Sequence, residues 1–247
     1  MSAFIVLCRD NCIEVVSDGA TYDTAGRLML VKRKAIALPE IPAAIFGRGA
    51  ENIVGTLSHL TAITSPILDI AGRPNTFDDL MKRLETELAP KVKEQADKLG
   101  PIPAEAQSEI AVAGFSRAMG PSLAIMRTFG IEYDHGPDGK EYLAPWKLYR
   151  LPQYWCAGPD ISEDIEAMGV TWDDLCRDGL RPYAVDFMET MRRKKDVNPL
   201  VEGDIPRHGI GGHVQLVTIT RDDARSEILH VWDDPIGEFI DPFRTAA

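Results

Sequence analysis

Three side chains near the N-terminus have the types and the order of a hydrolytic site. If Met1 is removed, Ser2 becomes the first residue and carries both a hydroxyl and a free α-amine. An α-amine titrates near pH 8, so a fraction of it is neutral at physiological pH and can take the proton of a neighbouring hydroxyl. Such a site also needs a cation that keeps the pKa of the amine low, and a carboxylate that holds the cation. Lys34 and Asp18 could supply these two groups.

Strand patterns around these residues can bring the three side chains together. Residues 2–8 and 12–18 are rich in β-formers and flank a short polar turn, which predicts a hairpin. Residues 3–8 are apolar on both faces, as in a strand covered above and below. A second turn leads into a third strand, residues 28–38, and we expect it to carry Lys34 back towards Ser2 and Asp18.

Two other basic residues compete for the role of Lys34. Lys32 shares a strand face with Lys34, whereas Arg33 points the other way.

The same residues carry a resemblance to a known family. Ser2, the segment Ser17-Asp18-Gly19-Ala20-Thr21 and Lys34 resemble the pattern of the proteasome-type N-terminal nucleophile (Ntn) hydrolases, which include proteasome β subunits. That pattern is a nucleophile at the mature N-terminus, an Asp in a D-x-x-A-T-like turn and a Lys on the third strand. The resemblance implies that Ser2 is the nucleophile, that Lys34 tunes its amine and that Asp18 holds Lys34, without a cofactor.

A glycine-rich segment extends the resemblance. Residues 46–51, Phe-Gly-Arg-Gly-Ala-Glu, fall close to the small-residue turn that opens the first helix in the family. A backbone N–H of that turn serves the oxyanion in family members. The resemblance therefore implies this role for the N–H of Gly47 or Arg48.

Three places depart from the family pattern. Active members carry an Asp and a Ser just before a late Gly-Gly turn, where this chain has Arg207 and Ile210 before Gly211 and Gly212. They also carry a Gly-Ser-Gly turn where this chain has Cys-Ala-Gly-Pro at residues 156–159. Asp204 is a candidate substitute for the missing acid. His208 and His213, on either side of the late turn, are assigned no role.

The order of patterns along the chain predicts the fold. Helical periodicity is found in residues 50–64, 76–99, 162–168, 171–178 and 182–195, and strand patterns in residues 109–115, 122–129, 141–148, 212–220 and 227–232. Two sheets face to face with helices outside would make a four-layer αββα sandwich, an α+β fold, in a single domain over residues 1–247. The family resemblance implies the same Ntn-hydrolase fold.

Composition restricts the partners and the compartment. The net charge of −11 argues against nucleic acid or an anionic membrane as the main partner. No apolar run is long enough for a membrane span, and no basic flank precedes the first apolar run as in a secretion signal. The four cysteines have no metal-ligand spacing, so no metal is expected. We expect a cytoplasmic protein.

Two functions remain open at this level. The first is an N-terminal serine amidohydrolase or peptidase that acts on a peptide or amide substrate through an acyl-enzyme. The second is a catalytically inactive scaffold or assembly subunit of the same fold, for example within a phage virion. Both interpretations include association into a homo-oligomer, because family members form rings through their outer helices.

Overall fold

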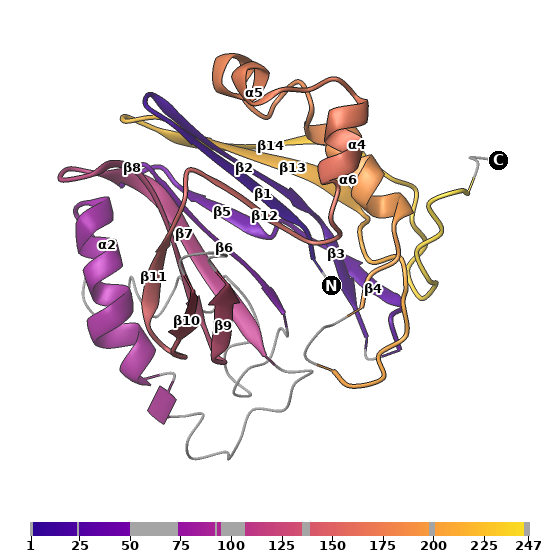
Figure 1. The fold of residues 1–247 in the computed structure, drawn as a ribbon, viewed down its shortest axis with the longest axis horizontal. Helices are drawn as coiled ribbons and strands as arrows, with labels where there is room; N and C mark the ends of the chain where they lie inside the picture. The colour runs from indigo at the N-terminus through magenta and orange to yellow at the C-terminus, as the bar shows by residue number, and fades with distance from the viewer. Residues whose placement is uncertain are drawn as a thin grey trace.

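Two five-stranded antiparallel sheets face each other at the centre of the molecule (Figure 1). The computed structural model describes residues 2–23, 25–49, 74–91, 93–94, 107–134, 139–197 and 201–244. The first sheet has the strand order β12-β1-β2-β13-β14 and the second has the order β11-β8-β7-β6-β5. In chain order these strands are β1 (Phe4–Arg9), β2 (Cys12–Asp18), β5 (Ala35–Leu38), β6 (Ala43–Gly49), β7 (Ser108–Ser116), β8 (Gly120–Arg127), β11 (Leu148–Leu151), β12 (Tyr154–Ala157), β13 (His213–Ile219) and β14 (Ala224–Val231).

Strand β1 shows why the first apolar run is uninterrupted. Phe4 and Val6 point into the layer between the two sheets, where they pack with Phe46 of β6. Ile5 and Leu7 point to the opposite face and pack beneath the helices. Both faces are therefore covered, and the prediction of a strand without a wet side is confirmed.

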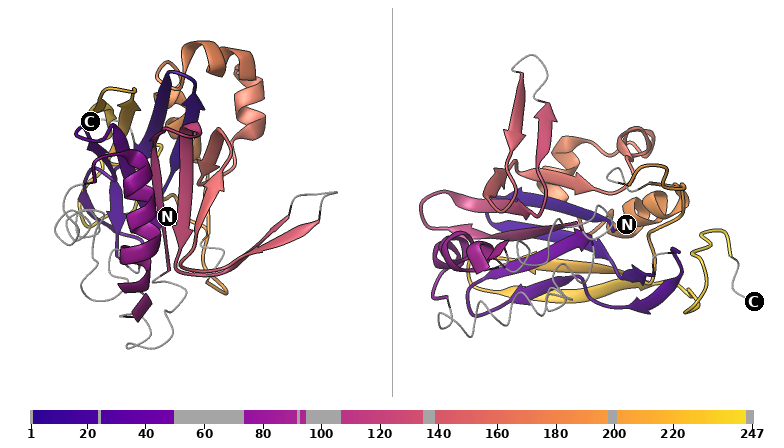
Figure 2. Two further views of the ribbon diagram at one scale, coloured as in Figure 1. Left: turned by 90° about the vertical axis from the view of Figure 1, so that its left-hand side faces the viewer. Right: turned by 90° about the horizontal axis from the view of Figure 1, so that it is seen from below.

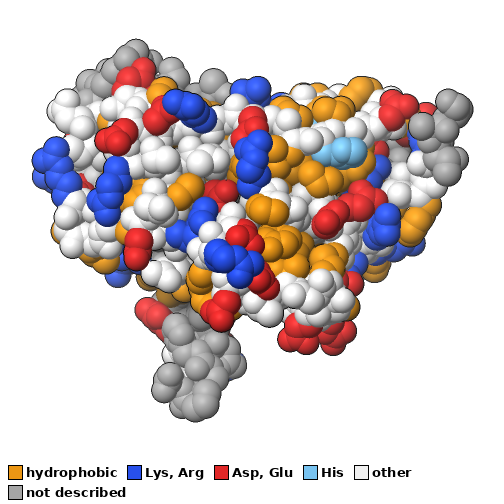
Figure 3. Space-filling model, turned by 90° about the horizontal axis from the view of Figure 1, so that it is seen from above, with side chains coloured by type: hydrophobic (Ala, Val, Ile, Leu, Met, Phe, Trp, Pro, Cys, Tyr) orange, Lys and Arg blue, Asp and Glu red, His pale blue; other side chains and the backbone are white. Residues whose placement is uncertain are grey.

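Helices cover the outward face of each large sheet. On the first sheet, α6 (Ala184–Arg193) buries an apolar stripe that includes Phe187, Met188 and Met191. Two shorter helices, α4 (Ser162–Ala167) and α5 (Trp172–Asp178), precede it. The second sheet is covered by α2 (Phe77–Arg83), which continues as the π-helical turn η1 (Leu84–Leu88). On the face of the molecule that carries α4 and α5, apolar side chains lie in patches among acidic and basic ones (Figure 3).

Two small sheets complete the described part of the chain. Strands β3 (Ala20–Tyr22) and β4 (Leu28–Val31) pair next to the N-terminal end of β1 (Figure 1). Strands β9 (Ile131–Asp134) and β10 (Lys140–Leu143) form an arm that projects from the body (Figure 2). In the described residues no helix is long and apolar enough to cross a membrane.

The predicted four-layer αββα sandwich is wrong, because the described helices do not form two full outer layers. A single described helix, α2 with its continuation η1, covers the second sheet, and the structure is mostly antiparallel β-sheet divided among several sheets. Two strands that the sequence pattern presents as continuous are each divided between sheets. Residues 28–38 form β4 and β5, and residues 141–148 end β10 and begin β11. The predicted helix 50–64 lies outside the described residues.

Several local predictions are confirmed. The first hairpin forms as β1 and β2, and residues 109–129 form the hairpin β7–β8. Thr76 caps α2 by accepting the amide of Asp79 at 3.1 Å. Thr171 and Asp174 form a capping box at the start of α5, where the helical pattern of residues 171–178 begins.

Candidate functional site

Ser2, Asp18 and Lys34 lie close together at the ends of strands from both large sheets. Ser2 stands just before β1, and Asp18 is the last residue of β2. Lys34 stands just before β5 of the facing sheet. The three residues are thus brought together by the hairpin β1–β2 and by the passage of the chain from one sheet to the other.

The ammonium of Lys34 links the other two side chains. Its Nζ donates to Oγ of Ser2 at 2.9 Å, and to Oδ1 and Oδ2 of Asp18 at 2.8 and 2.9 Å. The side chain of Asp18 is fully buried and that of Lys34 is 6% exposed. Because water screens such a pair poorly, the attraction between these charges is stronger than on the surface.

Backbone amides fix the Asp18 carboxylate from two sides. Oδ1 accepts the N–H of Ala3 at 3.0 Å, and Oδ2 accepts the N–H of Ala20 at 3.1 Å. A buried charge needs hydrogen bonds in addition to its counter-ion, and these amides supply them. The bond to Ala3 also ties Asp18 to the residue that follows Ser2.

Burial distinguishes Lys34 from its two sequence neighbours. Lys34 is buried, whereas Lys32 is half-buried and Arg33 is exposed. Within the described residues, the side-chain cation that contacts the Asp18 carboxylate is Lys34. Of the three basic residues weighed from the sequence, Lys34 is thus the one that the structure places beside Asp18.

Gly47 and Arg48 lie in a strand and not in a helix-opening turn. They belong to β6, where they pair with Ile110 and Glu109 of β7. The register of β6 with β5 pairs Phe46 with Ala35. The next residue of β6, Gly47, is therefore level with Lys34, at the end of the sheet that carries the site.

The side chain of Arg48 belongs to a buried charge cluster. Glu109 forms ion pairs with Arg48 and with Arg127, the latter at 2.5 Å. Burial alone would raise the pKa of Glu109, but the two guanidinium groups outweigh it and the pKa is lowered. The side chain of Arg48 is therefore engaged by Glu109.

His213 lies beside the site, although sequence reasoning assigned it no role. A Cβ on Gly19 would be 2.5 Å from its Cε1, so the imidazole packs directly on the residue after Asp18. Burial lowers the pKa of His213; Lys34 and Arg33 lower it further, and Asp18 opposes them. Among described residues its buried Nε2 has no hydrogen-bond partner.

Sequence reasoning also missed a buried amide. Gln215 on β13 is completely buried and bonds to the backbone of Lys34 and Ala35. A signal was present in the sequence: His213 and Gln215 interrupt a strand face that continues with the apolar Val217 and Ile219.

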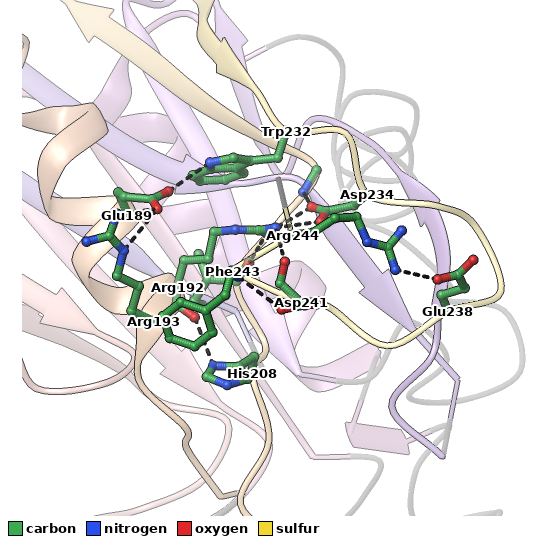
Figure 4. A network of polar contacts seen from close by, with 12 residues as sticks. Glu189, Arg192, Arg193, His208, Trp232, Asp234, Glu238, Asp241, Phe243 and Arg244 are labelled. Atoms are coloured by element: carbon green, nitrogen blue, oxygen red, sulfur yellow. Dashed lines mark hydrogen bonds and ion pairs between the residues drawn. The ribbon is translucent and has the colours of Figure 1, made fainter. Parts of the chain in front are cut away.

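A second network holds the turn before β13 (Figure 4). Arg192 of α6 forms a buried ion pair with Asp234 at 2.6 Å and donates to the carbonyl of Ile210 at 2.9 Å. Asp234 accepts the N–H of Gly212 at 2.8 Å. The carbonyl of Gly211 in turn accepts the N–H of Gly19 at 3.0 Å. The network therefore reaches the residue after Asp18 through the backbone.

The residues that depart from the family pattern make contacts with the core or with neighbouring side chains. Ile210 is fully buried in the core beneath α6. Arg207 forms an ion pair with Asp204, the acid considered as a substitute. Ala157 lies on β12 and pairs with Phe4. Within the described residues, no group of three or more His, Cys, Asp or Glu side chains could hold a metal ion.

Comparison with known proteins identifies the fold. No family model matches the chain, and no curated protein matches its sequence. Anbu (ancestral beta-subunit) from Yersinia bercovieri is similar in structure, with a TM-score of 0.60 and 12% identity over 94% of this chain and 89% of that chain. The Anbu (Gly-1) mutant from Hyphomicrobium sp. strain MC1 has a TM-score of 0.58 and 12% identity over 95% and 90%. The Anbu complex from Pseudomonas aeruginosa, solved as a helical assembly, has a TM-score of 0.59 and 13% identity over 94% and 88%.

These similarities correct the family suggested by the sequence. Anbu proteins are proteasome-like but form a distinct family, so the assignment to proteasome β-subunit-like hydrolases is wrong. At 12–13% identity the similarity shows a proteasome-like fold and does not assign an activity.

Proposed function

We propose that the chain is an N-terminal serine amidohydrolase in which Ser2 is the nucleophile. The observation that carries the proposal is that Lys34 Nζ contacts Ser2 Oγ and both carboxylate oxygens of Asp18 at 2.8–2.9 Å. Removal of Met1 would give Ser2 a free amine next to its own hydroxyl. Ser2 is small enough for ordinary methionine removal.

In this proposal each group has a distinct role. Lys34 donates to Oγ, so as an ammonium it stabilises the developing alkoxide and does not take its proton. The neutral α-amine of Ser2 is the base, and the charge of Lys34 keeps the pKa of that amine low. Asp18, held by the amides of Ala3 and Ala20, orients the ammonium.

The reaction then has two steps. Oγ of Ser2 attacks the amide carbonyl while its proton passes to the α-amine. The C–N bond breaks, the leaving nitrogen takes that proton, and an ester to Ser2 remains. Water attacks the ester while the amine takes one of its protons; the C–Oγ bond breaks, that proton returns to Oγ, and the acid product leaves.

The backbone near Gly47 is the proposed oxyanion site. Gly47 is level with Lys34 in the register of β5 and β6, and Arg48 follows it. An N–H at this place would face the carbonyl oxygen of a substrate bonded to Ser2. The substrate class is a peptide or another amide.

Intact-mass measurement with an electrophile tests the proposal. The purified chain should lack Met1, and a β-lactone should add once, at Ser2. The Ser2→Ala variant should keep the fold and form no adduct. Retention of Met1, or an adduct at another residue, would refute the proposal.

A second function is favoured by the residues before the late turn. Arg207 is paired with Asp204 and Ile210 is buried in the core, so neither contributes a carboxylate or a hydroxyl to the site. A non-catalytic subunit that associates with its own copies needs no such groups, and the similar Pseudomonas aeruginosa structure is a helical assembly. Sedimentation velocity would detect such a homo-oligomer, ring-like or helical. If the Ser2→Ala variant matched the wild type both in assembly and in reaction with the electrophile, this second function would be preferred.

A further inference from the structure

The buried amide of Gln215 joins the two sheets behind the candidate site. Its carbonyl Oε1 accepts the backbone N–H of Lys34 at 3.1 Å and that of Ala35 at 3.2 Å. The Nε2 group donates to the carbonyl of Ala35 at 2.6 Å and to Oγ of Ser226 at 2.8 Å. Both amide hydrogens and the oxygen are thus satisfied, as a fully buried polar side chain requires.

The same side chain reaches the strand that carries Asp18. Oγ of Ser17 donates to Oε1 of Gln215 at 3.3 Å, and the two residues are directly paired between β2 and β13. The next pair along this ladder is Asp18 with Val214. Gln215 is therefore fixed relative to Asp18 by the first sheet and holds the backbone of Lys34 in the second.

The backbone of Lys34 depends on its hydrogen bond to Gln215, because Lys34 stands before the first residue of β5. The pairing of β5 with β6 begins at Ala35, so the ladder of the second sheet does not include Lys34. Its amide is bonded across the interior to Gln215. This bond sets where the Lys34 side chain starts, and therefore where its Nζ lies between Asp18 and Ser2.

We propose that Gln215 is a positioning residue of this site: it bridges the facing sheets so that Lys34 Nζ reaches Asp18 and Ser2 Oγ at the same time. The proposal rests on the proposed role of Ser2 and adds to it. The hydrogen bonds of Gln215 within the described residues go to Ser17, Lys34, Ala35 and Ser226, and not to Ser2 Oγ or the Asp18 carboxylate. Gln215 acts through the backbone of Lys34 and through Ser17.

The principal variant is Gln215→Met, which keeps the length of the side chain and removes all its hydrogen bonds. The rate of β-lactone addition to Ser2 should fall roughly 10- to 100-fold, because misplacement of a catalytic group by about 1 Å has effects of this size. The pH at which the rate is half-maximal should also shift, because the ammonium that tunes the amine has moved. Ser226→Ala, which removes one partner of Gln215 only, should give a smaller change in the same direction and serves if Gln215→Met does not fold.

Val217→Ala is the matched control. Val217 is two residues along the same face of β13 and packs in the core between the sheets. The Val217→Ala variant should lower the free energy of unfolding but leave the rate of β-lactone addition and its pH profile as in the wild type. If Gln215→Met and Val217→Ala behave alike in rate and pH profile, Gln215 is only a core residue and the inference is overturned.

The NMR signal of Lys34 Nζ does not depend on any reaction at Ser2, so it tests this inference separately from the proposed function. In NMR spectra the Nζ signal of Lys34 should shift in Gln215→Met and stay unchanged in Val217→Ala. If wild-type Ser2 does not react with the electrophile, the proposed function fails, and this signal alone decides the positioning role. An unchanged Nζ signal in folded Gln215→Met overturns the inference.

Discussion

Nζ of Lys34 lies 2.8 Å from Oδ1 of Asp18, and the two side chains are 6% and 0% exposed. An ion pair buried to this degree contributes little net stability, but removal of one partner is costly because the other charge is left without compensation. The pair therefore explains both how the site is held and how it can be perturbed.

Lys34→Met should lower the free energy of unfolding by about 3–5 kcal/mol, because the carboxylate of Asp18 stays buried without its cation. Combination with Asp18→Asn should recover part of this loss, since neither charge remains, although the new NH2 group faces one of the N–H groups of Ala3 and Ala20. Neither variant should react with an electrophile at Ser2. Urea unfolding measures the first two effects, and a double variant as unstable as the single one would contradict the explanation.

Gly19→Ala should reduce the free energy of unfolding by about 1–3 kcal/mol, as overpacking of a tight interior does. The added Cβ would lie 2.5 Å from Cε1 of His213, so the ring would have to move. In a chain that already carries His213→Ala, the substitution Gly19→Ala should be far less costly. The effects of the two substitutions on stability should therefore be non-additive. A double-variant cycle in urea measures the coupling; additive effects would show that this contact is not the cause.

Stability should decrease in mild acid because of His213. Its pKa is lowered in the folded protein, by burial first, from the ordinary value of 6.5. Below pH 6.5 the unfolded chain therefore binds a proton that the folded protein binds less readily, and this contribution to stability, complete above that pH, is progressively lost.

The variant His213→Gln should weaken this pH dependence, whereas His230→Gln, at an exposed histidine, should retain it. Urea midpoints at several pH values on either side of 6.5 would measure the difference. Equal slopes for the wild type and His213→Gln would assign the acid sensitivity to other groups.

Asp234→Asn should destabilise the protein by about 3–5 kcal/mol, because Arg192 would be left as an unpaired buried charge. The exposed neighbour Asp233 provides the control, and Asp233→Asn should be close to neutral. Since Asp234 also accepts the N–H of Gly212, hydrogen exchange at Gly212 and Gly19 should accelerate in the first variant. Unchanged exchange at Gly19 would show that the network does not support the turn beside the site.

Local patterns in the sequence determined much of this molecule. The hairpin β1–β2, the hairpin β7–β8 and the caps of α2 and α5 follow from alternation, turn residues and capping chemistry, which act between near neighbours. The order of Ser2, Asp18 and Lys34 was also sufficient to predict that they meet. Each is separated from the next by strands and turns whose reach can be estimated from the chain itself.

Only the tertiary structure decided what surrounds these three residues. The continuous pattern of residues 28–38 does not show that the chain leaves one sheet for another just before Lys34, because both strands satisfy the same alternation. Ser17 and Gln215 are 198 positions apart, and their contact exists because β2 and β13 are neighbours in the sheet. A buried amide or charge takes whichever partners the crossing strands present, so pairings such as Arg192 with Asp234 cannot be deduced from spacing along the chain.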